Sequence, residues 1–433
     1  MTRSALRLLV IALPALLAAG CREASPQAAA PSTPAITMAA AGIRFDAAGP
    51  DMAFYAGPNG QFPRADLRNW WLPAYSVDSF SRLDEILPAH VVRRGEASAW
   101  RRAAVEPAIT YTVPSQFGGG RLSLDAYLDR NPVTGLLIAV GDTVQVERYR
   151  YGRTDAQRFT SFSMAKTICA LLVGLAVADG AIASIDDPAE RYVPVLKGSE
   201  YGRTPLRHLL TMSSGVRFRE EYDGNDDVSR LARATMPGGA GGIAAVQQFN
   251  DRYAQPGERW YYASAETEVL GLVLRAAIGR SIADYLSERV WRPIGAESDA
   301  SWVVDATGQE VTYAYFNAVL RDYARLGRLL ADGGRVGDRQ VVPAAWLAEM
   351  TRAQVSAART GRWYGYGFQT WIFPENDGSF VLLGVRGQSL FVDPGRRLVM
   401  VHTAVRRDSR DPRVAETLAL WRGVQAAFPR RRN

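Results

Sequence analysis

The 433-residue sequence contains very little cysteine and histidine. Its two cysteines are Cys21 and Cys169, so no disulfide framework can form. Its three histidines, His90, His208 and His402, follow no metal-ligand spacing, and we predict neither a metal nor a cofactor. No Gly-x-Ser-x-Gly motif is present, which sets aside the α/β-hydrolase fold. The chain is nevertheless long enough, and at 47% hydrophobic residues apolar enough, to form a sizeable core.

Nucleic acids and membranes are poorly matched partners for most of this chain. The formal charge of +7 is small for the length, and no basic stripe is interleaved with aromatics, so no nucleic-acid binding is expected. The most apolar internal stretch, which starts at Ser163, runs about 17 residues and carries Lys166 and Gly174, so it is a poor membrane span. Membrane contact is therefore expected only through the N-terminus.

The N-terminus has the pattern of a processing segment. Arg3 and Arg7 are followed by an apolar region from Leu8 to Leu17 and then by Ala18-Ala19-Gly20-Cys21. Small residues directly before a cysteine resemble a bacterial lipobox. The resemblance implies that Cys21 is lipidated and becomes the mature N-terminus.

This interpretation of the sequence predicts three parts in the chain. Residues 1–21 are expected to be a lipoprotein signal peptide, and residues 22–41, rich in Ala, Pro and Ser, are expected to be a disordered tether. Residues 42–433 form the folded domain. The expected location is the periplasmic side of the bacterial envelope as an outer-membrane lipoprotein, with ordinary secretion to the periplasm as the alternative.

A buried helix that opens at Ser163 carries the chemically informative pattern. Residues 168–178 are apolar on every side, which predicts a buried helix, and Gly180 is a natural stop. Lys166, one turn inside it, would be desolvated, which favours the neutral amine. Ser163 lies three residues earlier on the same face, so its hydroxyl can be activated as a nucleophile. Ser-x-x-Lys occurs in β-lactamases and penicillin-binding proteins, although so short a motif also arises by chance.

The remaining periodicity predicts an α+β fold. A hairpin is expected over 135–150, with its turn at Gly141-Asp142, and three strands are expected at 367–373, 389–392 and 398–403. Helices are predicted at 186–192, 204–212, in two pieces within 227–250, and at 266–278, 281–290, 322–330 and 412–428. Since strands lie near both ends, the terminal segments would form one antiparallel sheet, and residues 185–340 an inserted all-helical lobe.

A second group for catalysis is expected where this lobe meets the sheet. A Ser–Lys pair needs a group that protonates the leaving atom, and oxyanion donors. Tyr262 and Ser264 lie on the loop before the predicted helix at 266–278. A tyrosine beside a neutral lysine can act as a phenolate base or a phenol acid; the alternative is an aromatic anchor.

Together these segments resemble the serine β-lactamase and penicillin-binding superfamily. Within it, the chain most resembles 6-aminohexanoate-dimer hydrolases and related class C-like esterases. The implied fold is a β-lactamase-like antiparallel sheet flanked by helices, a three-layer sandwich with an inserted helical lobe. The segments that carry the resemblance are Ser163–Lys166, Asp186–Pro188, Leu209–Gly215, Glu220–Tyr222, Tyr262–Ser264, Asp322–Gly327 and Gly384–Gln388.

The resemblance implies a role for each site residue. Ser163 attacks the carbonyl and forms an acyl-enzyme, Lys166 is the general base, and Tyr262 relays the proton to the leaving amine or alcohol. The backbone N–H groups of Ser163 and Val385 form the oxyanion hole. Tyr222 helps to hold an amide substrate. Substrate contacts are implied for Tyr222, Ser264, Gly384 and Gly387.

Two departures from the β-lactamase pattern bear on substrate choice. Leu382-Leu383-Gly384 stands where β-lactamases carry Lys or His, then Thr or Ser, then Gly, so the cation that would hold a penicillin carboxylate is missing. The dimer hydrolases also lack that motif. Ser264 replaces the usual Asn and keeps one hydrogen-bonding group instead of two.

The leading hypothesis is a serine hydrolase that cleaves small amides or esters through an acyl-enzyme. One alternative is a β-lactamase or D-alanyl carboxypeptidase that acts on penicillin-like or peptidoglycan substrates. The other is a non-catalytic binding protein on the same fold. No oligomeric state is predicted.

Overall fold

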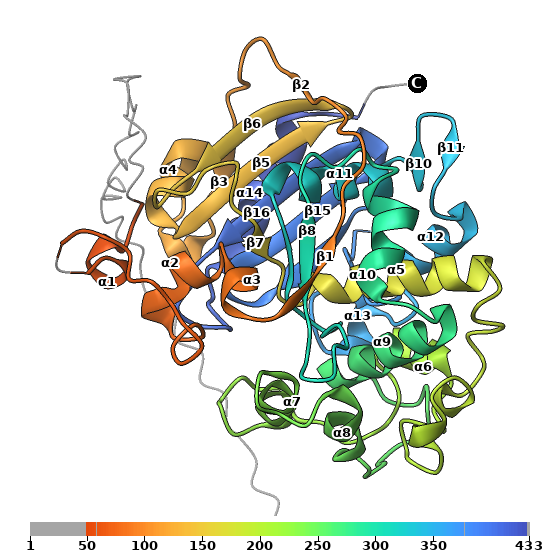
Figure 1. Cartoon of the computed structure of the whole chain (residues 1–433). Helices are drawn as coiled ribbons and strands as arrows, with labels where there is room; N and C mark the ends of the chain where they lie inside the picture. Colours follow the sequence, from red (N-terminus) through yellow and green to blue (C-terminus); the bar gives the residue numbers. More distant parts are fainter. Residues whose placement is uncertain (1–48, 58, 376, 431–433) are drawn as a thin grey trace, which may run out of the picture. The chain divides into compact units, whose positions relative to one another are not determined.

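The computed structural model describes residues 49–57, 59–375 and 377–430. The predicted signal peptide, the lipidation site Cys21 and the tether lie outside these residues. Within them, no helix combines the length and the apolar character needed to cross a membrane. Strands from both ends of the described chain share one large sheet, which has helices on both faces, as the sequence predicts (Figure 1).

The large sheet has eight strands in the order β12-β13-β14-β15-β16-β5-β6-β2. The predicted hairpin over 135–150 is confirmed as β5 and β6, and its turn holds Gly141 at a φ of 57°. β16 pairs antiparallel with β5, which joins the C-terminal strands to this hairpin. Among these strands only the edge strand β2 runs parallel to its neighbour, β6. Their bounds are β2 (Arg101–Arg102), β5 (Val133–Val140), β6 (Thr143–Tyr149), β12 (Gly365–Tyr366), β13 (Trp371–Ile372), β14 (Phe380–Gly384), β15 (Gln388–Asp393) and β16 (Leu398–Ala404).

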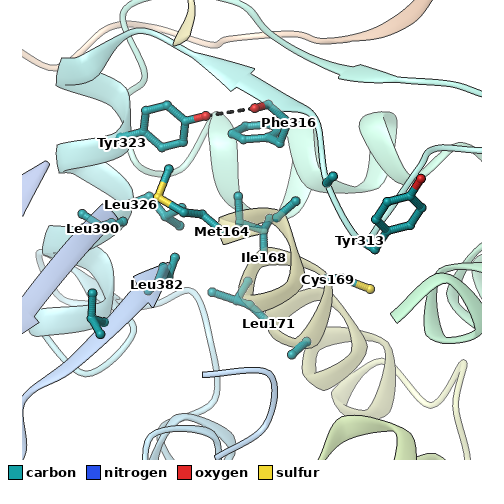
Figure 2. Close-up of a cluster of buried hydrophobic side chains, with 14 of the residues drawn as sticks. Met164, Ile168, Cys169, Leu171, Tyr313, Phe316, Tyr323, Leu326, Leu382 and Leu390 are labelled. Atoms are coloured by element: carbon teal, nitrogen blue, oxygen red, sulfur yellow. Dashed lines mark hydrogen bonds between the residues drawn. The ribbon is translucent and has the colours of Figure 1, made fainter. Parts of the chain in front are cut away.

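Helices cover both faces of this sheet and make three layers. Successive residues of a strand point to opposite faces. On β15, Phe391 stacks on Trp421 of α14 with ring centroids 5.2 Å apart, whereas Leu390 lies on the side of α11 and α5, with Leu326 and Leu171 (Figure 2). The predicted core position of Cys169 is confirmed in the buried cluster that Figure 2 shows. The layer helices are α5 (Met164–Ala178), α11 (Leu320–Ala331) and α14 (Val414–Ala427).

A second, four-stranded sheet positions the start of α5. Its order is β1-β8-β9-β7, and β7 leads directly into the turn before Ser163. Its strands are β1 (Ala89–Val92), β7 (Phe159–Thr160), β8 (Ala300–Val303) and β9 (Phe316–Ala318). β8 and β9 fall inside the segment 185–340, as do β10 (Arg335–Val336) and β11 (Arg339–Gln340). The middle of the chain is therefore not helical throughout, and α11 within it packs on the large sheet.

The helical lobe proper lies before β8. The predicted cap of Ser281 is confirmed, because its side chain accepts from the N–H of Asp284, but the helix changes to a π turn at Ser287–Trp291. The helix predicted at 186–192 is only a 3₁₀ turn, Ala189–Arg191. The lobe helices are α6 (Leu206–Leu210), α7 (Asp227–Thr235), α8 (Gly242–Gln247), α9 (Ser264–Ile278) and α10 (Ile282–Leu286). The other helices are α1 (Met52–Tyr55), α2 (Ser76–Ser79), α3 (Leu83–Ile86), α4 (Leu124–Arg130), α12 (Ala344–Met350) and α13 (Ala357–Thr360).

The strand predicted over 367–373 was wrong in its extent. The chain turns between β12 and β13, with the N–H of Gly367 donating to the carbonyl of Thr370 at 2.8 Å and Gln369 at a φ of 51°. Gln369 is held by long-range partners: its side chain donates to the carbonyl of Leu209 at 2.7 Å, and its carbonyl accepts from the hydroxyl of Thr167 at 2.6 Å. These tertiary bonds explain the turn.

Candidate active site

A hydrogen-bonded turn presents Ser163 at the start of α5. The N–H of Ser161 donates to the carbonyl of Phe316 at 2.7 Å, and its hydroxyl accepts from the N–H of Phe316 at 3.0 Å. Phe162 follows in the left-handed region with a φ of 43°, which is costly for an aromatic residue and typical of functional turns. Ser163 stands at the N-cap, but its hydroxyl makes no capping bond. That hydroxyl therefore stays available for chemistry.

Lys166 lies directly behind this hydroxyl. The side chain is buried, and Nζ donates to Oγ of Ser163 at 3.1 Å and to the carbonyl of Tyr313 at 2.7 Å. Burial lowers the pKa of Lys166 to about 8, while the carboxylates of Glu220 and Glu268 oppose the shift. An amine with this pKa can exchange its proton near neutral pH, so Lys166 is suited to accept the serine proton.

Tyr262 completes the triangle of side chains. The Nζ of Lys166 lies 5.2 Å from the centre of the Tyr262 ring, which stacks on Trp371 with centroids 5.4 Å apart. Burial and the nearby charge of Glu220 raise the pKa of Tyr262, and a hydrogen bond with Ser163 lowers it only in part. The phenol therefore stays protonated at neutral pH, which suits a proton donor better than a phenolate base.

The C-terminal end of β14 supplies the second side of the site. Gly384 approaches the nucleophile turn so closely that a Cβ there would lie 2.3 Å from the carbonyl oxygen of Ser161. Over the described residues, the backbone N–H groups of Ser163 and Val385 donate to no protein acceptor. Two free amides beside a nucleophile are the arrangement that an oxyanion hole requires.

Buried side chains hold the turn after Val385 in place. Gln388 donates from Nε2 to the carbonyl of Ala404 at 2.7 Å and to that of Arg386 at 3.3 Å. Nδ1 of His402 lies 2.7 Å from the carbonyl oxygen of Gly387. Burial lowers the pKa of His402 to about 3, so the ring is neutral and donates from Nδ1. His402 therefore supports the turn.

Glu220 organises the wall that faces this turn. Its Oε1 accepts from the hydroxyl of Tyr222 at 2.6 Å and from that of Ser264 at 2.9 Å, and its Oε2 accepts from the N–H of Ser264 at 2.7 Å. Ser264 is 1% exposed and does not line the cavity, whereas Glu220 does. The predicted contact of Ser264 with substrate is thus replaced by a bond that holds Glu220.

One cavity of about 640 Å³ brings the other predicted residues together. The predicted residues in its lining are Ser163, Tyr222, Tyr262, Gly384, Val385 and Gly387. Lys166 lies behind Ser163. In the described chain, no group of three or more His, Cys, Asp or Glu side chains could hold a metal ion, and His90 instead contacts Glu310 at 2.8 Å.

The sequence reasoning missed Glu220, Gln388 and the carbonyl of Tyr313 as parts of the site. Glu220 and Gln388 both lie in segments that carry the family resemblance, so that signal was present. The carbonyl of Tyr313 comes from a backbone atom that no motif marks. It reaches Lys166 because Tyr313 lies just before β9, which pairs with the strand that leads into the nucleophile turn.

The fold and the known relatives define a serine hydrolase of the amidase and esterase type. The chain belongs to the Beta-lactamase family, whose model matches residues 123–423. It is 27% identical over 367 residues to a 6-aminohexanoate-dimer hydrolase of Paenarthrobacter ureafaciens, covering 81% of this chain and 90% of that protein.

Solved structures share the fold at lower identity. A structure of a candidate 6-aminohexanoate-dimer hydrolase from Bacillus anthracis has a TM-score of 0.74 at 24% identity and covers 84% of this chain and 98% of its own. A D-stereospecific amidohydrolase from Streptomyces sp. has a TM-score of 0.52 at 17% identity, covering 69% and 95%. These likenesses confirm the predicted β-lactamase-like α+β fold.

Proposed function

We propose that this enzyme hydrolyses small amides or esters through an acyl-enzyme on Ser163. The observation that carries the proposal is the 3.1 Å contact between Nζ of Lys166 and Oγ of Ser163, with the Tyr262 phenol beside both. Linear amides are the favoured class, since the relative with 27% identity is named for the dimer of 6-aminohexanoate and Tyr222 lines the cavity. The missing Lys or His before Gly384 disfavours the β-lactamase alternative.

The first half of the reaction forms the acyl-enzyme. Neutral Lys166 takes the hydroxyl proton as Oγ of Ser163 bonds to the carbonyl carbon. The developing oxyanion is stabilised by the N–H groups of Ser163 and Val385. When the C–N or C–O bond breaks, Tyr262 gives its proton to the leaving atom and regains one from Lys166. In the second half, water loses a proton to the same pair as its oxygen bonds to the acyl carbon. When the bond between the acyl carbon and Oγ then breaks, that proton passes to Oγ of Ser163 and the acid is released.

A covalent probe tests the proposal directly. A fluorophosphonate should label the wild-type protein at Ser163, and Ser163→Ala should remove both labelling and p-nitrophenyl hexanoate hydrolysis while the circular dichroism spectrum is unchanged. A folded protein that neither labels nor turns over the ester would support the binding-protein alternative. Labelling at another serine would contradict the assignment.

We further propose that the chain is anchored to the outer membrane through a lipid on Cys21. The Ala18-Ala19-Gly20-Cys21 segment supports it. Full-length protein expressed in a Gram-negative host should incorporate labelled palmitate and sediment with membranes, and Cys21→Ala should lose both properties. Equal incorporation by the Cys21→Ala protein would contradict the proposal.

A further inference from the structure

Arg386 occupies an unusual place beside the oxyanion hole. It follows Val385 directly, lines the cavity, and has a φ of 61° and a ψ of 20°, which is strained for a residue other than glycine. Its carbonyl accepts from the N–H of Arg406 at 3.2 Å and from the side chain of Gln388. The backbone at Arg386 is thus fixed, and its side chain starts next to the N–H that would face the reacting carbonyl.

The guanidinium of Arg386 forms no ion pair in the described chain, and the carboxylate of Asp408, which also lines the cavity, acts on its charge only from a distance. The guanidinium donates no hydrogen bond to a described residue, and its Cζ lies 5.8 Å from the centroid of the Phe80 ring. Its Nη1 is buried without any protein acceptor. Burial lowers the pKa of Arg386, although a guanidinium remains charged at neutral pH. A buried donor without an acceptor is unfavourable, so an anionic ligand that reached Nη1 would satisfy it.

The other arginines of the cavity differ from Arg386. Arg410 forms an ion pair with Glu221, and Arg406 donates to Thr417 and to the carbonyl of Arg413. Arg362 also lines the cavity and forms no ion pair in the described chain, but its side chain is exposed to solvent above Trp371. Arg406 also keeps one buried nitrogen, Nε, without an acceptor, but it follows β16, whereas Arg386 directly follows Val385.

We propose that Arg386 binds a carboxylate of the substrate, so that the enzyme prefers amides and esters that carry an anionic group close to the reacting carbonyl. The proposal rests on the proposed function of the same cavity, because it names the substrate class of that reaction. A guanidinium and a carboxylate can form two parallel hydrogen bonds, which fixes orientation as well as affinity. A carboxylate bound at Arg386 would set the distance from the anionic group to the carbonyl at the oxyanion hole.

Matched pairs of esters test this preference. The acyl-side pair is mono-p-nitrophenyl adipate and p-nitrophenyl hexanoate, and the leaving-group pair is 4-acetoxybenzoate and its methyl ester. In at least one pair the wild type should show kcat/KM roughly tenfold or more higher for the anionic member. Arg386→Gln should bring that ratio to about one and change hydrolysis of the neutral ester less than about threefold, and Arg386→Lys should retain part of the preference.

Arg362→Gln is the matched control and should leave the ratio unchanged within about twofold. Equal activity toward both members of each pair would overturn the proposal. So would an Arg386→Gln enzyme that loses both esters equally, because Arg386 would then act only on the turn. A preference removed by Arg362→Gln instead would assign the carboxylate to Arg362 and would also overturn it.

Binding separates this inference from the proposed reaction. Calorimetry on the Ser163→Ala protein should show tighter binding of adipate monoamide than of hexanamide, and Ser163→Ala/Arg386→Gln should lose the difference. Such a result supports the carboxylate site even if none of the esters is hydrolysed. If Ser163 hydrolyses the neutral ester but neither binding nor turnover favours the anion, the proposed function stands and the Arg386 site falls.

Discussion

The polar groups on the two walls of the cavity differ in whether they have hydrogen-bond partners within the protein. On the wall formed by the helical lobe, both carboxylate oxygens of Glu220 accept hydrogen bonds, from Tyr222 and Ser264. On the wall formed by the turn between β14 and β15, the N–H of Val385 and the guanidinium of Arg386 have no acceptor in the described chain. Satisfied groups hold the catalytic side chains in position, whereas free donors beside a nucleophile are available to a ligand. This contrast supports the proposals that the lobe wall orients the reaction and that the β14–β15 turn recognises the substrate.

The largest effect should come from removing the base between the walls. Lys166→Met keeps much of the side-chain volume but leaves no group to accept the Ser163 proton, so kcat/KM for p-nitrophenyl hexanoate should fall by about 10³-fold or more. Circular dichroism and thermal unfolding would show that the protein is folded. Turnover near the wild-type rate would refute the Ser–Lys assignment.

The second effect disrupts the wall at the β14–β15 turn without changing a catalytic side chain. The Cβ introduced by Gly384→Ala would meet the Ser161 carbonyl at 2.3 Å. The end of β14 must therefore move, and the N–H of Val385 moves with it. Loss of one oxyanion donor typically lowers kcat about 10²- to 10³-fold, and we expect a loss near the lower value. Steady-state kinetics with p-nitrophenyl hexanoate measure the fall in kcat.

Gly57→Ala is the control for that change. Gly57 has an ordinary φ, and its new Cβ would meet only the carbonyl of Gln61 at 3.4 Å. It should retain full activity. If Gly384→Ala is equally active, the close approach of β14 to the nucleophile turn does not position an oxyanion donor.

The comparison of walls also shows what the sequence could and could not predict. Ser163, Lys166, Tyr262 and Val385 were predictable because each lies in a short segment with a chemical signature. The structure places Ser163, Tyr262 and Val385 around one cavity, with Lys166 behind Ser163. The large sheet was predictable because its strands carry strong apolar patterns that leave one partner arrangement for the two ends of the chain.

The parts that were not predictable depend on distant partners. The turn at Gln369 is set by bonds to Leu209 and Thr167, which no local periodicity shows. The role of Ser264 depends on Glu220, 44 residues earlier, which turns an expected substrate contact into an internal bond. The free nitrogen of Arg386 also depends on the fold, because no acceptor in the described chain lies within hydrogen-bonding distance of Nη1.

The smallest expected effect is a shift in the pH profile of kcat/KM, and it tests the role of the lobe wall. Because neutral Lys166 is the base, kcat/KM should rise with pH and level off above the Lys166 pKa of about 8. The negative charges of Glu220 and Glu268 raise that pKa, so removing one of them lowers it. Glu220→Gln should therefore move the rising limb toward lower pH, by less than about one unit.

Two variants separate the charge of Glu220 from its hydrogen bonds. Ser264→Ala keeps the charge but removes the 2.9 Å bond to Oε1, so the limb should stay in place while kcat falls only a few-fold. Glu221→Gln alters a cavity carboxylate that pairs with Arg410 and does not act on Lys166, so neither quantity should change much. Profiles of kcat/KM from pH 6 to 10 decide the matter. A limb that Glu220→Gln leaves fixed, or moves to higher pH, would mean that the lobe wall holds the catalytic side chains by geometry without setting the charge of the base.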